Sequence, residues 1–128
     1  MGDKINTEDD ERMVFIHPSG NVLYFSSNGH PGIGGYDIYK SELVEGEWTI
    51  PVNMGYPINT VYDDAHFYVN NDGKEAYISS NRPGGLGSYD IYQVDLFPAE
   101  DLITLAGNFD DGLATLQANA NITVEQTD

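Results

Sequence analysis

Short apolar and aromatic runs alternate along the chain with clusters of glycine, proline, asparagine and aspartate. Two pairs of runs each flank a polar turn: 13–16 and 22–26 around His17-Pro18-Ser19-Gly20, and 67–69 and 75–79 around Asn70-Asn71-Asp72-Gly73. Aspartate followed by glycine between two apolar runs is a strong hairpin signal, because glycine accepts the positive φ of a tight turn. No stretch shows the 3.6-residue period of an amphipathic helix. The pattern predicts antiparallel strands.

Each hairpin is followed by a glycine-rich loop and a third run long enough for a strand. The loops and the strands after them are 28–35 with 36–43, and 81–88 with 89–96. In the first half, Glu45-Gly46-Glu47 predicts a turn into a fourth strand at 48–52. Residues 53–60 then form a linker to the second half.

The two halves are copies of one unit with a period of 53 residues. Of the first 40 positions, 17 are identical one period later, far more than unrelated segments would share. The matched motifs are Ile-Asn-Thr (5–7 and 58–60), Ser-Ser-Asn (26–28 and 79–81) and Tyr-Asp-Ile-Tyr (36–39 and 89–92). Four short antiparallel strands in each copy, with a repeated linker, are the layout of a propeller blade.

We therefore expect an all-β chain: two four-stranded antiparallel blades of a β-propeller, as an incomplete ring, with a C-terminal β extension. The blades span 1–53 and 54–97, and the second is incomplete because the match between the copies ends near Leu96. The extension, 98–128, is long enough to supply the missing fourth strand and then to begin another domain. Its expected elements are strands at 102–106 and 122–125 and a turn at Asp110-Asp111-Gly112.

Composition narrows the classes of function. The net charge is −16, with 21 acidic residues against 5 lysines and arginines. Nucleic acid and anionic lipid both bind basic surfaces, so neither is expected as a partner. Nine tyrosines favour a folded domain with an acidic surface, and no apolar run reaches the roughly 20 residues of a membrane helix. The absence of cysteine excludes disulfides, thiolate metal sites and cysteine nucleophiles.

The polar residues of the repeated motifs are candidate site residues, but their presence in both copies favours a structural role. They are Ser26, Ser27, Asp37 and Tyr39 with their counterparts Ser79, Ser80, Asp90 and Tyr92. A carboxylate between aromatic residues on a packed strand is costly unless it is hydrogen bonded. We expect Asp37 and Asp90 to accept hydrogen bonds from the serine hydroxyls and loop amides of their own copies.

Other patterns of ligand or catalytic chemistry are incomplete. The segment Gly32-Ile33-Gly34-Gly35 precedes a strand, so it lacks the helix N-terminus of a phosphate-binding loop. His66 with Asp63 and Asp64 is a thin metal-ligand set, and no spacing matches an EF-hand loop. The repeated serines have no repeated histidine as base. We predict no enzyme activity, cofactor or metal, and a core position for Trp48.

Several motifs that occur twice in the same order resemble TolB-type β-propeller repeats, and they are most similar to those of exported OmpA-family proteins of Bacteroidetes-like bacteria. The motifs are Phe25-Ser26-Ser27-Asn28, residues 79–92, Gly46-Glu47-Trp48 and the linker 53–60. The resemblance covers residues 1 to about 96. In that family a carboxypeptidase-regulatory-like β-sandwich and a peptidoglycan-binding domain often follow the propeller. Residues 104–124 are similar to the start of such a sandwich.

The resemblance implies a non-catalytic module for protein–protein binding or scaffolding, periplasmic or outer-membrane-associated in a Gram-negative bacterium. Its partner would be a protein of the cell envelope, bound through rim-loop residues Asn28, His30, Asn81 and Arg82. Two alternatives remain open. One is the accessory propeller of a hydrolase whose catalytic residues lie outside this chain, and the other is a self-assembling carbohydrate-binding ring.

Two blades cannot close a propeller ring, because such rings contain at least four. We therefore expect completion either by further blades of a longer chain or by association of copies. Three two-blade chains would form a six-bladed homo-oligomer, although repulsion between chains of charge −16 opposes it.

Overall fold

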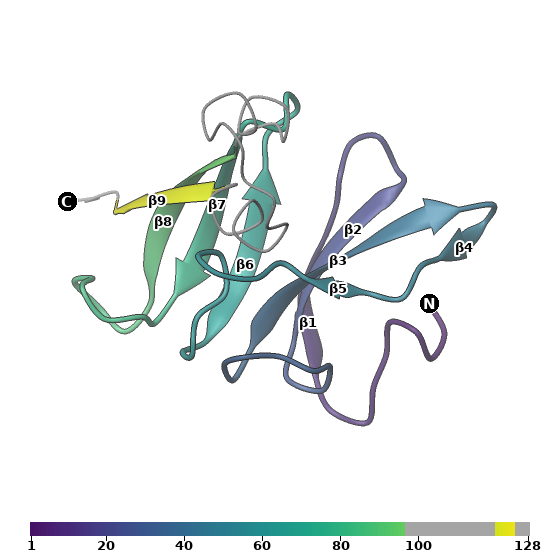
Figure 1. Ribbon diagram of the computed structural model, residues 1–128, viewed down its shortest axis with the longest axis horizontal. Helices are drawn as coiled ribbons and strands as arrows, with labels where there is room; N and C mark the ends of the chain where they lie inside the picture. The colour runs from purple at the N-terminus through teal and green to yellow at the C-terminus, as the bar shows by residue number, and fades with distance from the viewer. Residues whose placement is uncertain (97–119, 125–128) are drawn as a thin grey trace, which may run out of the picture.

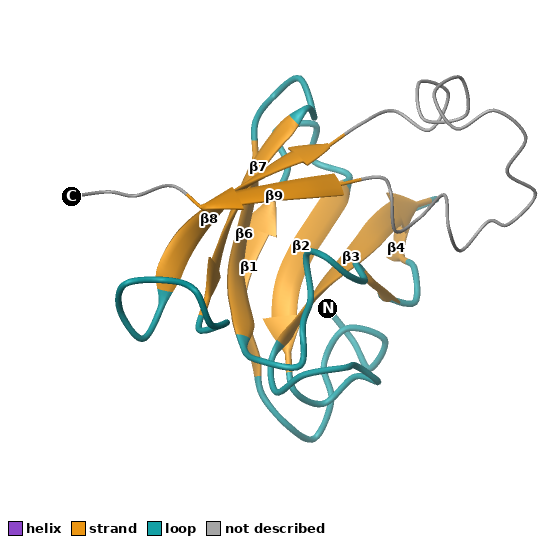
Figure 2. Ribbon diagram, turned by 60° about the vertical axis from the view of Figure 1, so that its left-hand side comes forward, coloured by secondary structure: helices purple, strands orange, loops and turns teal. Residues whose placement is uncertain are grey.

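A computed structural model describes residues 1–96 and the backbone of residues 120–124. All regular secondary structure in this part of the chain is β, which confirms the predicted all-β class, and it contains no helix able to span a membrane (Figures 1 and 2). The strands are β1 (Glu11–Ile16), β2 (Val22–Ser27), β3 (Asp37–Val44), β4 (Glu47–Trp48), β5 (Val52–Asn53), β6 (Asp64–Val69), β7 (Glu75–Ser80), β8 (Asp90–Leu96) and β9 (Ala120–Val124).

These strands form two antiparallel sheets, neither of which closes on itself within the described residues. The first sheet has the order β1-β2-β3-β4, with β5 also paired to β3. The second has the order β6-β7-β8-β9. Within residues 11–44 and 64–96, sequence order and spatial order agree because each connection between neighbouring long strands is a hairpin or a glycine-rich loop.

The predicted single fourth strand at 48–52 is wrong, and the first sheet has five strands instead of four. Its outer edge is broken between β4 and β5, which pair with different parts of β3. Pro51 has no N–H for the ladder. At Thr49 the carbonyl oxygen accepts a bond from Ser41 Oγ at 2.6 Å instead of continuing regular pairing. The outer strand therefore leaves β3 after Trp48 and pairs with it again at Val52.

In the second sheet the outer edge is an unbroken strand from the C-terminal extension. Strand β9 pairs with β8 so that Val124 lies opposite Tyr92 and Ala120 lies opposite Leu96. In the first sheet the equivalent positions of β3 face Asn53 and Trp48, so β9 occupies the place of β5 and β4 together. The predicted strand at 102–106 and the predicted turn at 110–112 lie outside the described residues.

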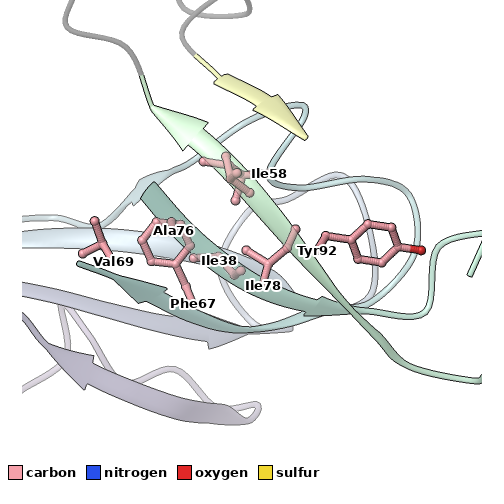
Figure 3. Close-up of a cluster of buried hydrophobic side chains, with 8 residues drawn as sticks. Ile38, Ile58, Phe67, Val69, Ala76, Ile78 and Tyr92 are labelled. Atoms are coloured by element: carbon pink, nitrogen blue, oxygen red, sulfur yellow. The ribbon is translucent and has the colours of Figure 1, made fainter. Parts of the chain in front are cut away.

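The two sheets pack face to face, and β6 lies against β1, β2 and β3 (Figure 1). The core between them joins Ile38 of the first sheet to alternate residues of the second (Figure 3): Phe67, Val69, Ala76, Ile78, Tyr92 and Val94, with Ile58 from the linker. Every one of these side chains is at most 4% exposed. Alternate residues of a strand point to the same face of the sheet. The remaining residues of each strand therefore point to the opposite face.

On its other face the first sheet carries a smaller cluster of Leu23, Phe25 and Tyr39, covered by Ile5 of the N-terminal segment. Trp48 packs against this cluster but is only partly buried, so its predicted core position is confirmed only in part. Ile5 and Ile58 are equivalent in the repeat, so each linker covers the same face of its own sheet.

Candidate binding site at the loop end

The two glycine-rich loops lie at one end of the molecule, where β2 leads into β3 and β7 leads into β8. Asp37, at 1% exposure, accepts hydrogen bonds from the amides of Ile33 and Gly34 and from Asn53 Nδ2. Asp90 accepts the amide of Gly87 at 3.1 Å. Loop amides are therefore bound by the repeated aspartates, as predicted, and each aspartate fixes the shape of the loop that precedes it.

The serine hydroxyls do not donate to these aspartates, which corrects that part of the prediction. Ser27 Oγ donates to Glu11 at 2.8 Å and accepts the amides of Gly29 and His30. Ser80 Oγ accepts two bonds from Arg82, one from its amide and one from Nε. A hydroxyl has one proton to donate, and Ser27 gives it to the nearer carboxylate on β1. These serines bind the start of each loop while the aspartates bind its end.

The remaining motif residues have similar structural surroundings. Tyr39 and Tyr92, both 2% exposed, donate from their hydroxyls to loop carbonyls, those of His30 and Arg82 respectively. Ser26 is fully buried and donates to the carbonyl of Arg12.

Arg82, predicted as a rim-loop binding residue, lies largely inside the molecule. Its guanidinium donates to the carbonyls of Pro57 and Ile58 and forms an ion pair of 2.7 Å with Asp64. The side chains of Arg82 and Asp64 are 11% and 0% exposed, and the guanidinium also stacks over the ring of Tyr92. Only a small part of Arg82 is thus accessible to a partner.

The other three predicted rim residues also make internal contacts. Asn28 Oδ1 accepts the amide of Asp10 at 2.9 Å, and Asn81 Oδ1 accepts the equivalent amide of Asp63 at 2.8 Å. The ring of His30 contacts the Ile5 carbonyl through Nε2 at 2.7 Å. Each of them ties a loop to the linker that precedes its sheet. Their predicted role in binding a partner stays a prediction.

A cavity of about 320 Å³ lies at this end, between the first residues of β1 and β6. Its lining combines one cation with tyrosine, serine and histidine side chains: Arg12, Met13, Ser26, Tyr36, Ala65, His66, Ser79 and Tyr89. Ser79, predicted as a structural residue, is therefore in the wall of the cavity together with its counterpart Ser26. The lining positions come in equivalent pairs from the two copies, so the cavity lies at the junction between them.

Two tyrosine–aspartate pairs flank the cavity. Tyr36 donates to Asp10 at 3.1 Å, and Tyr89 donates to Asp63 at 3.2 Å. Hydrogen bonds from Arg12 and Tyr36 hold the pKa of Asp10 below its ordinary value. Burial, followed by the neighbouring aspartates, raises the pKa of both tyrosines. Both phenols are therefore protonated at neutral pH and act as donors.

The loop tips carry apolar side chains at equivalent positions. Ile33 is 51% exposed and Leu86, one period later, is 74% exposed. Sequence analysis did not single them out, although an apolar residue retained in both copies of a glycine-rich loop was a usable signal. Tyr89, at the end of the second loop, is 48% exposed and also lines the cavity. We call these exposed loop residues, Ile33, Leu86 and Tyr89, the apolar rim.

No group of three or more histidine, cysteine, aspartate or glutamate side chains among the described residues is placed to hold a metal ion. Asp63, one of the residues considered for a metal, already accepts hydrogen bonds from the amide of Tyr36 and the hydroxyl of Tyr89.

Comparison with protein-family models, curated proteins and solved structures finds no match.

Proposed function

We propose that this chain is a non-catalytic, propeller-type module that binds a protein partner in the bacterial cell envelope. The observation that carries the proposal is the apolar rim, where Ile33 and Leu86 are exposed at equivalent positions of two loops that are bound at their ends by Asp37 and Asp90. Exposed apolar side chains on rigid supports are typical of protein interfaces, because little side-chain or loop entropy is lost on binding.

Several features support a protein partner in preference to a small substrate. The cavity between β1 and β6 has a single arginine, which is held between Asp10 at 2.9 Å and the ring of Tyr36 at 4.9 Å. Aromatic and arginine side chains are enriched at the energetic centres of protein interfaces. The strongly negative net charge favours a partner whose contact surface is basic.

The family and location of the proposal rest on the resemblance to TolB-type repeats of exported OmpA-family proteins. The stacking of two equivalent sheets is compatible with that resemblance. We accordingly place the module in the periplasm or at the outer membrane of a Gram-negative bacterium.

The proposal is tested by site-specific photocrosslinking in a Gram-negative host that carries the gene. A photoreactive amino acid at position 33 or 86 should capture the same envelope protein, whereas one at the exposed Asn71, in the turn between β6 and β7, should not. The purified partner should then bind the chain about tenfold more weakly when Leu86 is replaced by serine. Capture of the partner equally well from position 71, or full affinity of the variant, would exclude the rim as the binding surface.

A further inference from the structure

Equivalent residues of the two copies differ sharply in exposure, and the differences fall on opposite outer faces. Phe67 and Val69 of β6 are 3% and 2% exposed against the first sheet, whereas their counterparts Val14 and Ile16 on β1 are 67% and 52% exposed. Conversely, Ile38 on β3 is fully buried, and its counterpart Ile91 on β8 is 52% exposed. Each open face thus carries one half of the contact that joins the two sheets.

The internal junction also contains a polar clasp. Asn59, fully buried, accepts the Ile38 amide at 2.7 Å and donates to the Ile38 carbonyl at 2.8 Å. Nearby, Asp63 Oδ1 accepts the Tyr36 amide at 3.0 Å, and the Asp64 amide donates to the Tyr36 carbonyl at 2.8 Å. The linker of the second copy is therefore fastened to the backbone of the first sheet at two adjacent points.

The residues of a second such clasp are divided between the two ends of the molecule. Asn6, the counterpart of Asn59, is exposed in the N-terminal segment that precedes β1. Asp10, the counterpart of Asp63, is exposed in the same segment. Their targets by the same equivalence are the backbones of Ile91 and Tyr89, at and just before the start of β8. Asp10 already makes the bond to Tyr36 Oη that matches the Asp63–Tyr89 pair.

We propose that the open face of the first sheet binds the open face of the second sheet of another copy of this chain, head to tail, in the register of the internal junction. In that contact Val14 and Ile16 would meet Ile91 of the neighbouring copy, and Asn6 would clasp its backbone. The internal junction shows which surface fits the open face of the first sheet, so the occupant is a second copy of this chain.

The open face also has room for the larger side chains of the neighbour. A hollow of about 290 Å³ lies on it, lined among others by Ile5, Met13, Val14, Leu23 and Phe25. In the second copy the ring of Phe67 stands where the first copy has the smaller Val14, and it contacts Tyr24 at a centroid distance of 4.7 Å. Tyr77 is the counterpart of Tyr24 and would approach the hollow from the neighbouring copy.

The contact is heterologous, since it joins two different surfaces, and such contacts produce closed rings or open chains. This inference goes beyond the proposed binding function, because its apolar contacts lie on the sheet faces, whereas partner binding uses Ile33 and Leu86 at the loop tips. Repulsion between chains of charge −16 opposes association, so raising the salt concentration should strengthen the contact.

Sedimentation velocity of the full chain tests the proposal directly. At high micromolar concentration and about 0.5 M NaCl, where charges are screened, we expect species larger than the 14.1 kDa monomer. Val14→Lys and Ile91→Lys each remove one face, and each variant alone should be monomeric. An equimolar mixture of the two retains one intact pair of faces per two chains and should form a dimer.

Both lysine variants reduce the net negative charge, so weaker association cannot result from added repulsion. Ile50→Lys, at a 73% exposed position on the broken edge of the first sheet, is the matched control and should associate like the parent chain. Circular dichroism melting of each variant checks folding, and Asn6→Ala offers a milder change that should also weaken association. A parent chain that stays monomeric, association that survives either face variant, or a mixture that forms no dimer would each overturn the proposal.

Discussion

Arg82 is the residue whose charge compensates a fully buried carboxylate. Asp64 has no exposed side-chain surface, and its two oxygens are shared between Arg82 and the Thr60 amide and hydroxyl. We predict that Arg82→Met lowers the free energy of unfolding by about 3–5 kcal/mol, because it leaves a buried charge without its partner. Urea denaturation measures the loss.

Two further variants make this prediction specific. Arg82→Met combined with Asp64→Asn should recover part of the loss, because the neutral amide no longer needs a buried cation. Lys74→Met changes an exposed cation and should stay within about 0.5 kcal/mol of the parent. If Arg82→Met were as mild as Lys74→Met, the buried ion pair would not stabilise the second sheet.

Glu11 occupies the position of Asp64 in the first copy and is stabilised without an arginine. Burial raises the pKa of Glu11, but bonds from the Thr7 amide, Thr7 Oγ1 and Ser27 Oγ outweigh it and hold the pKa below its ordinary value. A lowered folded-state pKa contributes stability that is complete above the unfolded pKa and is lost as pH falls through the folded pKa.

We therefore predict that Glu11→Gln costs about 1 kcal/mol at pH 7, a value reduced by the partial exposure of this carboxyl. The difference from the parent chain should shrink as pH is lowered from 5 towards 3. Unfolding curves at several pH values measure it, with Glu8→Gln at an exposed position as the control. A difference that stays constant over this pH range would argue against ionised Glu11 as the stabilising form.

The role of a residue could be predicted where the residue occurs in both copies and binds groups that are close to it in the sequence. The structural role of Asp37 and Asp90 followed from their presence in both copies, and each binds amides only a few positions away. The internal contacts of Arg82 could not be predicted in this way. Its counterpart is Gly29, and the Asp64 carboxylate and Pro57 carbonyl that it binds are 18 and 25 positions distant in the sequence.

At the scale of elements, the linker is what joins one sheet to the next. Asn59 makes two bonds to Ile38 and a third, of 2.9 Å, to Asn53 Oδ1. We predict that Asn59→Ala lowers the free energy of unfolding by about 2–4 kcal/mol, because the backbone groups of Ile38 lose their partners in a buried setting.

The repeat supplies a matched control for this change. Asn6 is the same residue at the same place in the unit but is exposed, so Asn6→Ala should cost less than about 0.5 kcal/mol. Both variants are to be compared by urea denaturation at low micromolar concentration, where self-association does not contribute. Equal costs for the two variants would show that the clasp to Ile38 adds nothing to stability.

Most strands were predictable because their signals are local. Alternating apolar residues and the turn at Asp72-Gly73 placed β6 and β7, and the glycine-rich loops placed the starts of β3 and β8 within one residue. The break between β4 and β5 and the pairing of β9 were harder. Both depend on which residues of β3 or β8 pair with the edge strand. The linear pattern of the sequence does not contain that information.

At the scale of the whole molecule, one unit used twice produces a stack of two sheets with two unlike outer faces. The contact that buries Ile38 against Phe67 is repeated nowhere else within the described residues, so the matching surfaces remain exposed at Val14 and Ile91. A period in the sequence predicted the stack, but only the structure shows which faces meet. Side-chain register across the junction is the information that the sequence lacks.

The charge of the whole chain leads to the last prediction. With 21 acidic residues, 5 basic ones and four ion pairs among the described residues, repulsion should dominate the surface electrostatics. We predict that the melting temperature of dilute chain rises by several degrees between about 0.02 and 0.5 M NaCl, as screening relieves repulsion in the folded state. Low protein concentration separates this effect from self-association, and KCl should act equally if screening is the cause. A melting temperature that falls with salt would instead mean that attractive pairs such as Arg82–Asp64 outweigh the net charge.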